Sequence, residues 1–155
     1  MYQKVKEMVD TIYPQLIAIR RDLHQHPELG LEEYRTSALV LDYLQQWNIK
    51  VTQLIGETAI VGLIEGNPGE KTIGLRADMD ALPIEEKTGA PYASLIPGKM
   101  HACGHDVHTT ILLGASYILQ QLKEEFKGNV KVFFLAAEET VGGAKPMSGG
   151  GCLEH

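Results

Sequence analysis

Residues 129–136 read Asn-Val-Lys-Val-Phe-Phe-Leu-Ala, and this apolar stretch decides the fold class. Valine, phenylalanine and leucine in so short a run favour a β-strand, and the run is too apolar to be exposed on both faces. Strands that are buried on both faces lie at the centre of an α/β sheet. We therefore expect residues 129–136 to form a central strand, with helices packed against its sheet.

The rest of the chain alternates helix and strand around this segment. Apolar residues recur at helical spacing in three stretches, which are residues 5–24, 36–47 and 108–126. Pro14 falls inside the first pattern, where a kink or a break of the helix can occur. Residues 59–65 and 72–77 read as strands, and the turn residues at 67–70 predict that these two strands form a hairpin.

Three polar segments lie next to the ends of these elements. Residues 76–80 (Arg-Ala-Asp-Met-Asp) follow one predicted strand, and Glu138 with Glu139 follows the central one. Residues 101–108 lead into the long helix. Because sites in open α/β sheets form beyond the carboxyl ends of the strands, we expect the three segments to converge on one rim of the sheet.

The residue types in these segments suit a metal ion. Residues 101–108 read His-Ala-Cys-Gly-His-Asp-Val-His. Cysteine supplies a soft sulfur, histidine a borderline nitrogen and glutamate a hard oxygen, and a transition metal binds all three. Glu138 and Glu139 hold one carboxylate more than the metal needs, and the spare one could act as a base. The two clusters therefore indicate metal-assisted hydrolysis.

Composition limits the class of protein. With 155 residues, 44% hydrophobic and 22% charged, the chain suits one soluble globular domain. The net charge of -6 argues against nucleic acid or a membrane surface as a partner, and no apolar run is long enough to span a bilayer. Two cysteines, Cys103 and Cys152, make no disulfide framework, and residues 1–10 are amphipathic rather than a signal peptide. A cytoplasmic location is therefore expected.

The motifs closely resemble those of the M20 metallopeptidase family. The similar segments are residues 76–83 (Arg-Ala-Asp-Met-Asp-Ala-Leu-Pro), 100–108 (Met-His-Ala-Cys-Gly-His-Asp-Val-His), 137–139 (Ala-Glu-Glu), 21–30 and 142–147. They fit the amidohydrolase branch, which includes hippurate hydrolase, N-acyl-amino-acid and auxin-conjugate amidohydrolases and N-acetyldiaminopimelate deacetylase. The resemblance implies an aminoacylase-like enzyme with two divalent metal ions (zinc, manganese, cobalt or nickel). Its substrate would be a small N-acyl amino acid, and the parent protein would be a homo-oligomer.

The resemblance also implies a fold and a place within it. The fold is the three-layer α/β arrangement of zinc peptidases (phosphorylase/hydrolase-like), with a mixed central sheet that is incomplete in this chain. Residues 1–155 would be the N-terminal part of the catalytic domain, and two further histidine ligands and the lid or dimerisation domain would follow. His155 lies too early to match the next family histidine. We expect such a fragment to be inactive, and residues 129–136 to leave an exposed edge that promotes self-association.

Residue roles follow from the resemblance, position by position. Cys103 matches the thiolate that bridges both ions, His105 a terminal ligand and Glu139 a ligand from the next motif. Glu138 matches the general base, which takes a proton from metal-bound water and returns it to the leaving amine.

Four further residues are expected behind the ligands or in structural roles: Asp78, Asp80, His101 and Asp106. In related branches the position of Asp78 orients a histidine two residues earlier, where this chain has Arg76. Asp106 is either the N-cap of the long helix or the residue that orients His105. His24 and His26 are expected to be structural.

Other interpretations of the same residues stay open. Cys103 could be a small buried hydrophobic residue, or the reactive thiol of a redox protein. His101 and His105 could form an i, i+4 pair of ligands on a helix, although Gly104 argues against that helix. The chain could also be a truncated metal-binding domain without catalysis, or part of an M20 dipeptidase or carboxypeptidase. Cys152 is expected to have no chemistry.

Overall fold

The computed structural model describes residues 1–55 and 57–141. The helices are α1 (Tyr2–Gln25), α2 (Tyr34–Gln46), α3 (His105–Gln121), the 3₁₀ helix η1 (Lys123–Glu125) and α4 (Glu138–Val141). The strands are β1 (Lys50–Ile55), β2 (Ala59–Glu65), β3 (Asn67–Asp78) and β4 (Lys127–Leu135). They form a sheet in the order β1-β2-β4-β3, in which β3 and β4 run parallel and the other pairs antiparallel. The predicted α/β class with a mixed sheet is confirmed.

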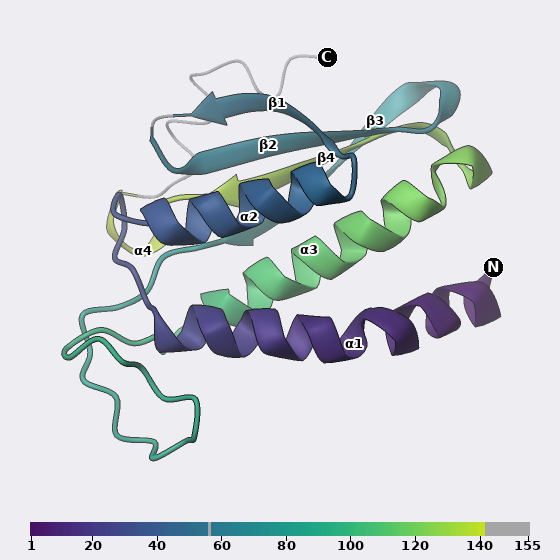
Figure 1. Ribbon diagram of the computed structural model, residues 1–155. Coiled ribbons are helices and arrows are strands. Elements are labelled where there is room, and N and C mark those ends of the chain that lie inside the picture. Colours follow the sequence, from purple (N-terminus) through teal and green to yellow (C-terminus); the bar gives the residue numbers. More distant parts are fainter. Residues whose placement is uncertain (56, 142–155) are drawn as a thin grey trace.

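Helices α2 and α3 lie against one face of the sheet, and α1 packs on α3 (Figure 1). The main core lies between these helices and the strands. Four elements each contribute a side chain with no exposed surface: Leu23 from α1, Leu44 from α2, Leu113 from α3 and Phe134 from β4. Burying one such side chain contributes about 1.5–3 kcal/mol, so this core is what holds the helices on the sheet.

Strand β4 lies in the middle of the sheet, as its sequence predicts. It pairs with β2 on one side and with β3 on the other. Val132 and Phe134 are fully buried in the helix-facing core, whereas Phe133 and Leu135 belong to a smaller apolar cluster. Because both edges of β4 are paired, the exposed edge expected at residues 129–136 is wrong. The edge strands are β1 and β3. The predicted self-association assumed an open edge on β4, so this reason for it no longer holds.

Strands β2 and β3 do not form the predicted hairpin. They follow each other in sequence, but β4 lies between them. The main-chain N–H of Gly66 donates to the carbonyl oxygen of Gly128 (3.0 Å), and that of Asn67 donates to Phe126 (2.9 Å). Residues 67–70 therefore belong to β3. The apolar β4 buries more surface between two strands than at an edge, and this long-range gain outweighs the local turn signal.

All three predicted helices form, with boundaries that differ from the prediction by a few residues. Helix α1 runs through Pro14 without a break, because Pro14 is exposed and water can satisfy the carbonyl group that loses its partner. Helix α3 begins at His105 rather than at residue 108, directly after Gly104, whose φ of 87° is not helical. Strand β1 was not predicted. It adds an antiparallel edge to β2.

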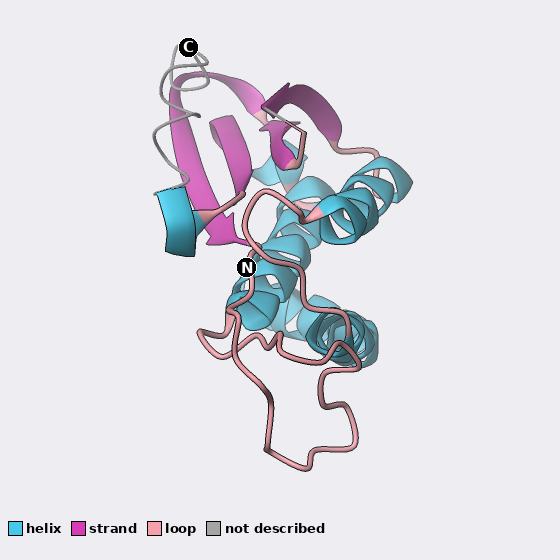
Figure 2. Cartoon of the chain, turned by 90° about the vertical axis from the view of Figure 1, so that its left-hand side faces the viewer, coloured by secondary structure: helices cyan, strands magenta, loops and turns pink. Residues whose placement is uncertain are grey.

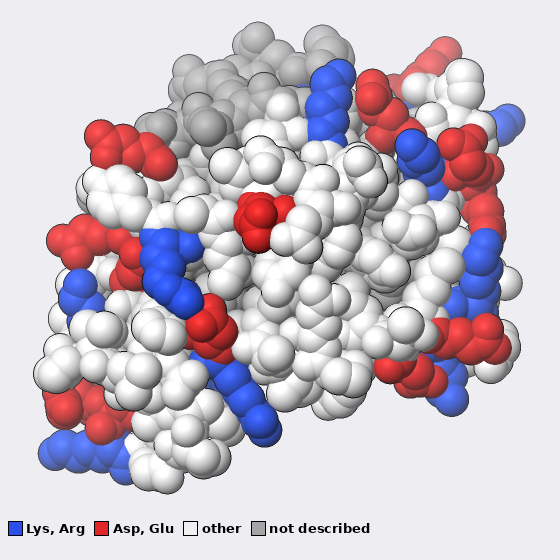
Figure 3. Space-filling view, viewed as in Figure 1, with Lys and Arg blue, Asp and Glu red and all other residues white. Residues whose placement is uncertain are grey.

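Charged side chains are spread unevenly over the face that carries the helices (Figure 3). They gather towards the two ends of this face, and its middle is largely uncharged. Acidic and basic groups are interspersed at those ends, so the described residues give this face no continuous basic stripe of the kind that follows nucleic acid. Among the described helices, none combines the length and the apolar character needed to cross a bilayer.

Candidate metal centre

The candidate site lies at the carboxyl ends of β3 and β4, which run parallel beside each other. Asp78 ends β3, and Glu138 and Glu139 begin α4 directly after β4. His105 begins α3. Figure 2 shows this end of the molecule, with the short helix α4 beside the strand ends and the long loop that precedes α3. The predicted convergence of three polar segments on one rim is confirmed.

Cys103, His105 and Glu139 lie close enough to hold a metal ion between them. One donor atom from each lies within 4.8 Å of the other two, and Nε2 of His105 is 3.7 Å from Oε1 of Glu139. A thiol, an imidazole and a carboxylate are donors that zinc and similar ions bind, so these side chains fit such an ion. Cys103 is exposed, and it is therefore not a small buried hydrophobic residue.

Asp80 fixes both His105 and Glu139. Nδ1 of His105 lies 2.9 Å from the main-chain oxygen of Asp80 and 3.2 Å from its Oδ1, so Nδ1 carries a proton and Nε2 can offer a lone pair. Oδ2 of Asp80 accepts the main-chain N–H of Glu139 at 2.9 Å. Burial raises the pKa of Asp80, but the bonds from His105 and Glu139 outweigh it and lower that pKa overall. The hydrogen bond to Asp80 raises the pKa of His105 in turn.

Asp78 is held by Arg76, which lies two residues earlier on β3. Nε and Nη2 of Arg76 donate to Oδ1 of Asp78 at 3.0 and 2.5 Å. The other oxygen, Oδ2, lies 3.9 Å from Nε2 of His105 and 3.7 Å from Nδ1 of His108. Arg76 also lies 3.9 Å from Oε1 of Glu138. One guanidinium thus joins the strand-end aspartate to the candidate base.

His101 is buried beside this site but outside α3. Neither of its ring nitrogens has a hydrogen-bond partner in the part of the chain that the structure describes. Burial lowers the pKa of His101 to about 4, so its ring is neutral. Because α3 starts only at His105, the two histidines are not an i, i+4 pair on one helix, and that rival ligand geometry is excluded.

Asp106 is neither the helix N-cap nor the partner of His105, so both expectations for it are wrong. The N-cap is Gly104. Oδ2 of Asp106 lies 2.7 Å from Nδ1 of His24 and 2.9 Å from Nε of Arg20, both on α1. Asp106 points from the first turn of α3 towards α1, and Asp80, two residues after the end of β3, orients His105 instead. His24 is buried and has the structural role expected of it.

Glu33 is a buried carboxylate that the sequence analysis missed. It has no exposed surface, and it accepts the main-chain N–H of Ala137 at 2.7 Å and the hydroxyl of Thr58 at 3.0 Å. Ala137 has a φ of 54°, so Glu33 stabilises a strained turn directly before Glu138. Burial raises the pKa of Glu33. Glu32, its exposed neighbour, has the same sequence character, and no sequence signal separates the two.

The protonation of Cys103 bears on the redox interpretation. Its hydrogen bond to Glu139, followed by partial burial and nearby carboxylates, raises the pKa of Cys103 to about 11. A reactive redox cysteine needs a thiolate near neutral pH. These surroundings therefore disfavour redox chemistry, whereas a metal ion would replace the proton on sulfur.

Some residues singled out in the sequence lie outside the described part of the chain. They are Cys152, His155 and residues 142–147. What the sequence predicts for them stays a prediction.

Comparisons with known proteins agree on one family. The family model described as peptidase family M20/M25/M40 matches residues 74–155. The chain is 45% identical over 156 residues to thermostable carboxypeptidase 2 of Saccharolobus solfataricus. That match covers 99% of this chain and 40% of the carboxypeptidase. The chain is also 46% identical over 137 residues to the hippurate hydrolase of Campylobacter jejuni, and this match covers 88% of the chain and 35% of the hydrolase.

Solved structures show the same relationship. The YXEP protein of Bacillus subtilis, a dinuclear metal-binding peptidase from the M20 family, superposes with a TM-score of 0.89 at 39% identity. That match covers 94% of this chain and 41% of the other. The chain thus spans about two fifths of the length of the relatives it matches.

Proposed function

The chain belongs to peptidase family M20/M25/M40, and from this premise we propose that the whole protein is a metal-dependent amidohydrolase that cleaves N-acyl amino acids. The hippurate hydrolase of Campylobacter jejuni, at 46% identity, supports an acyl amino acid as substrate. In this proposal residues 1–155 are the N-terminal part of the catalytic domain, and the chain spans about two fifths of the length of the relatives it matches.

One observation carries this proposal. Cys103, His105 and Glu139 bring three different metal-binding atoms within 4.8 Å of one another, and Glu138 stands beside them with 40% of its side chain exposed. One carboxylate can therefore bind an ion while the adjacent one stays available for proton transfer.

In this proposal Cys103, His105 and Glu139 would be this chain's ligands to divalent ions (zinc, manganese, cobalt or nickel), and the description of the Bacillus subtilis relative as dinuclear supports two of them. When bound, such ions supply Lewis-acid activation of the substrate carbonyl and of water. Asp80 keeps His105 in the tautomer that presents Nε2 and holds the main chain of Glu139. Glu138 takes up a proton as the nucleophile forms and delivers it to the leaving amine.

A second candidate function is hydrolysis of a peptide from its carboxyl end. The relative from Saccharolobus solfataricus is named a carboxypeptidase and is 45% identical to this chain. Both reactions break a C–N bond next to a carbonyl group, so the same side chains serve either one. They differ in the group that flanks the carbonyl.

The test measures metal content and turnover of the intact protein with N-acetyl and N-benzoyl amino acids and with dipeptides. Glu138→Gln should keep its metal and lose turnover by about 10²–10⁴-fold, whereas Glu139→Gln should lose metal as well. Glu124→Gln alters an exposed glutamate on η1 and is the matched control. Residues 1–155 alone should show no turnover, because three protein side chains do not complete a two-ion site.

Three outcomes would contradict the proposal in different ways. Metal loss in Glu138→Gln with retention in Glu139→Gln would reverse the two roles. Faster turnover of dipeptides than of N-acyl amino acids would favour the peptidase. Tight metal binding without turnover of either substrate by the intact protein would leave a metal-binding domain without catalysis.

A further inference from the structure

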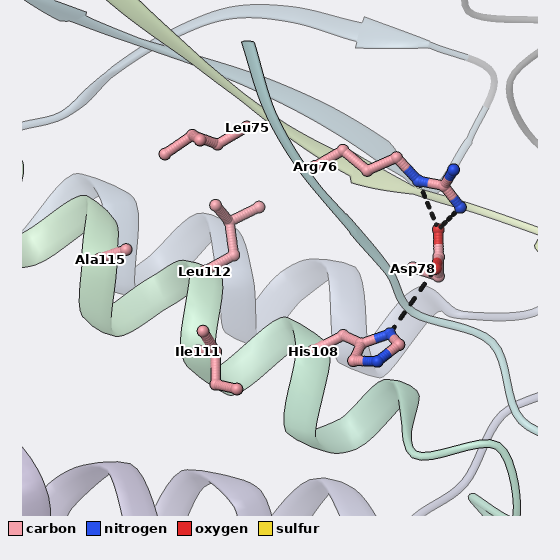
Figure 4. A pocket seen from close by; sticks show the side chains of 7 residues that line it. All are labelled: Leu75, Arg76, Asp78, His108, Ile111, Leu112 and Ala115. Carbon is pink, nitrogen blue, oxygen red and sulfur yellow. Dashed lines mark hydrogen bonds and ion pairs between the residues drawn. The ribbon is translucent and has the colours of Figure 1, made fainter. Parts of the chain in front are cut away.

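A pocket of about 410 Å³ lies between β3 and α3, beside the candidate metal centre (Figure 4). Its wall is largely apolar and comes from Leu75 and the middle of α3. At its polar end Arg76, Asp78 and His108 meet. The proposed hydrolysis uses neither Asp78 nor His108, so this polar end has no assigned role.

Asp78, His105 and His108 present donor atoms to one point at this end. Oδ2 of Asp78 lies 3.7 Å from Nδ1 of His108 and 3.9 Å from Nε2 of His105, and the three donors all lie within 4.8 Å of one another. His105 and His108 share one face of α3 because they are three residues apart. Donors around a tetrahedral ion are about 3.4 Å apart when its bonds are about 2.1 Å long, so the two distances from Oδ2 of Asp78 exceed that spacing by a few tenths of an ångström.

Two features make these donors available to an ion. Arg76 binds only Oδ1 of Asp78, and the carboxylate also faces the ring of His108 (Figure 4). Oδ2 of Asp78 is the oxygen that lies near both His105 and His108. The side chain of His108 is 51% exposed at the pocket mouth, so its ring can turn towards an ion and the ion can enter from solvent.

The two sets of donors compete for a single atom. Nε2 of His105 belongs to the set with Cys103 and Glu139 and also to the set with Asp78 and His108. Nδ1 of His105 is committed to Asp80. One nitrogen lone pair binds one ion, so His105 can serve one set at a time.

We propose that Asp78, His105 and His108 form an alternative site for a divalent ion, and that the ion held by His105 exchanges between this site and the one containing Cys103. The alternative site has two imidazoles and a carboxylate but no sulfur. Harder ions such as Mn²⁺ should therefore favour it, whereas Zn²⁺ and Co²⁺ should favour the thiolate of Cys103. This proposal concerns binding alone and stands or falls independently of the hydrolysis.

The experiment titrates the chain of residues 1–155 with Mn²⁺, followed by electron paramagnetic resonance, and with Co²⁺, followed by thiolate-to-cobalt charge-transfer absorption. His108→Ala should weaken Mn²⁺ binding at least about 10-fold and leave the cobalt–thiolate absorption intact. Cys103→Ala should lose that absorption and still bind one Co²⁺. The double variant should lose both tight sites. His26→Ala removes a histidine outside both sets and is the matched control.

His108 is half exposed, so its removal should not unfold the chain. Asp78→Asn, which keeps the side-chain shape, is the second variant and should weaken Mn²⁺ binding in the same way. Unchanged Mn²⁺ affinity in both His108→Ala and Asp78→Asn would overturn the proposal. So would a Cys103→Ala variant that binds Co²⁺ no better than the double variant does.

Discussion

The first turn of α3 has two sides that are built in opposite ways. His105 faces the rim of the sheet, where Asp80 holds one ring nitrogen and leaves the other open. Asp106, the next residue, faces α1 and meets His24 and Arg20. On the first side, Nε2 of the buried His105 lies near the carboxylates of Asp78 and Glu139 and keeps its lone pair for an ion. The second side encloses its charge between helices.

Exposure follows this division at the outer donors, whereas His105 itself is only 2% exposed. Cys103 and His108 on the donor side are exposed, whereas Asp106 and His24 on the anchoring side keep 1% and 5% of their surface. Neighbouring residues of one helix turn thus have different roles. His105 offers a metal ligand, and Asp106 fixes α3 to α1. Substitutions on the anchoring side should change stability, and those on the donor side should change metal binding.

The largest expected effect lies on the anchoring side. Asp106→Ala should lower the free energy of unfolding by about 3–5 kcal/mol, because it leaves His24 and Arg20 without their shared buried carboxylate. Urea unfolding measures this, with Asp42→Ala on the exposed face of α2 as a control that should stay within about 0.5 kcal/mol. A loss no larger than that of the control would mean that Asp106 does not anchor α3.

A smaller effect is expected on the donor side. Asp80→Asn should weaken Zn²⁺ binding about 10–100-fold, since the carboxylate behind His105 sets its tautomer and orientation. Competition with a chromophoric chelator gives the affinity, and Asp10→Asn on the exposed side of α1 is the control. If Asp80→Asn lost stability while its Zn²⁺ affinity stayed unchanged, Asp80 would belong with the anchoring residues instead.

The smallest expected effect concerns Glu33. This residue is buried, but it stabilises the turn directly before Glu138 on the donor side. Its pKa is raised in the folded chain, so the folded state holds the Glu33 proton more firmly than the unfolded state does. The stability from this residue is therefore greatest at low pH and falls as the pH rises through the raised pKa. Glu33→Gln cannot titrate, so its stability relative to the parent chain should increase between about pH 4 and pH 8.

Urea unfolding at both ends of that pH range measures the difference. Glu32→Gln, at the exposed neighbour, should follow the parent chain at both. Parallel pH profiles for Glu33→Gln and the parent would show that burial does not perturb Glu33.

The sequence predicted what depends on residue type and near neighbours. The apolar run of residues 129–136 indicated the central strand, and Cys103 and His105 stood out because a thiol and an imidazole lie two positions apart. It did not predict what depends on distant main chain. Glu33 binds the N–H of Ala137, which lies 104 residues further along the chain. The hairpin failed for the same reason, because β4 arrives from far in the sequence to separate β2 from β3.

Gly104 has a consequence for mutational tolerance. Its φ is 87°, and apart from its chain neighbours no atom of the described residues lies within 4 Å of the position a Cβ would take, so the backbone conformation is the main restriction there. Side chains make the left-handed region cost about 1–2 kcal/mol, with asparagine and aspartate the least affected and β-branched residues the most. In a library of all substitutions at position 104, survival should rank by left-handed propensity rather than by volume. Tryptophan would then fare no worse than alanine, and valine worse than either.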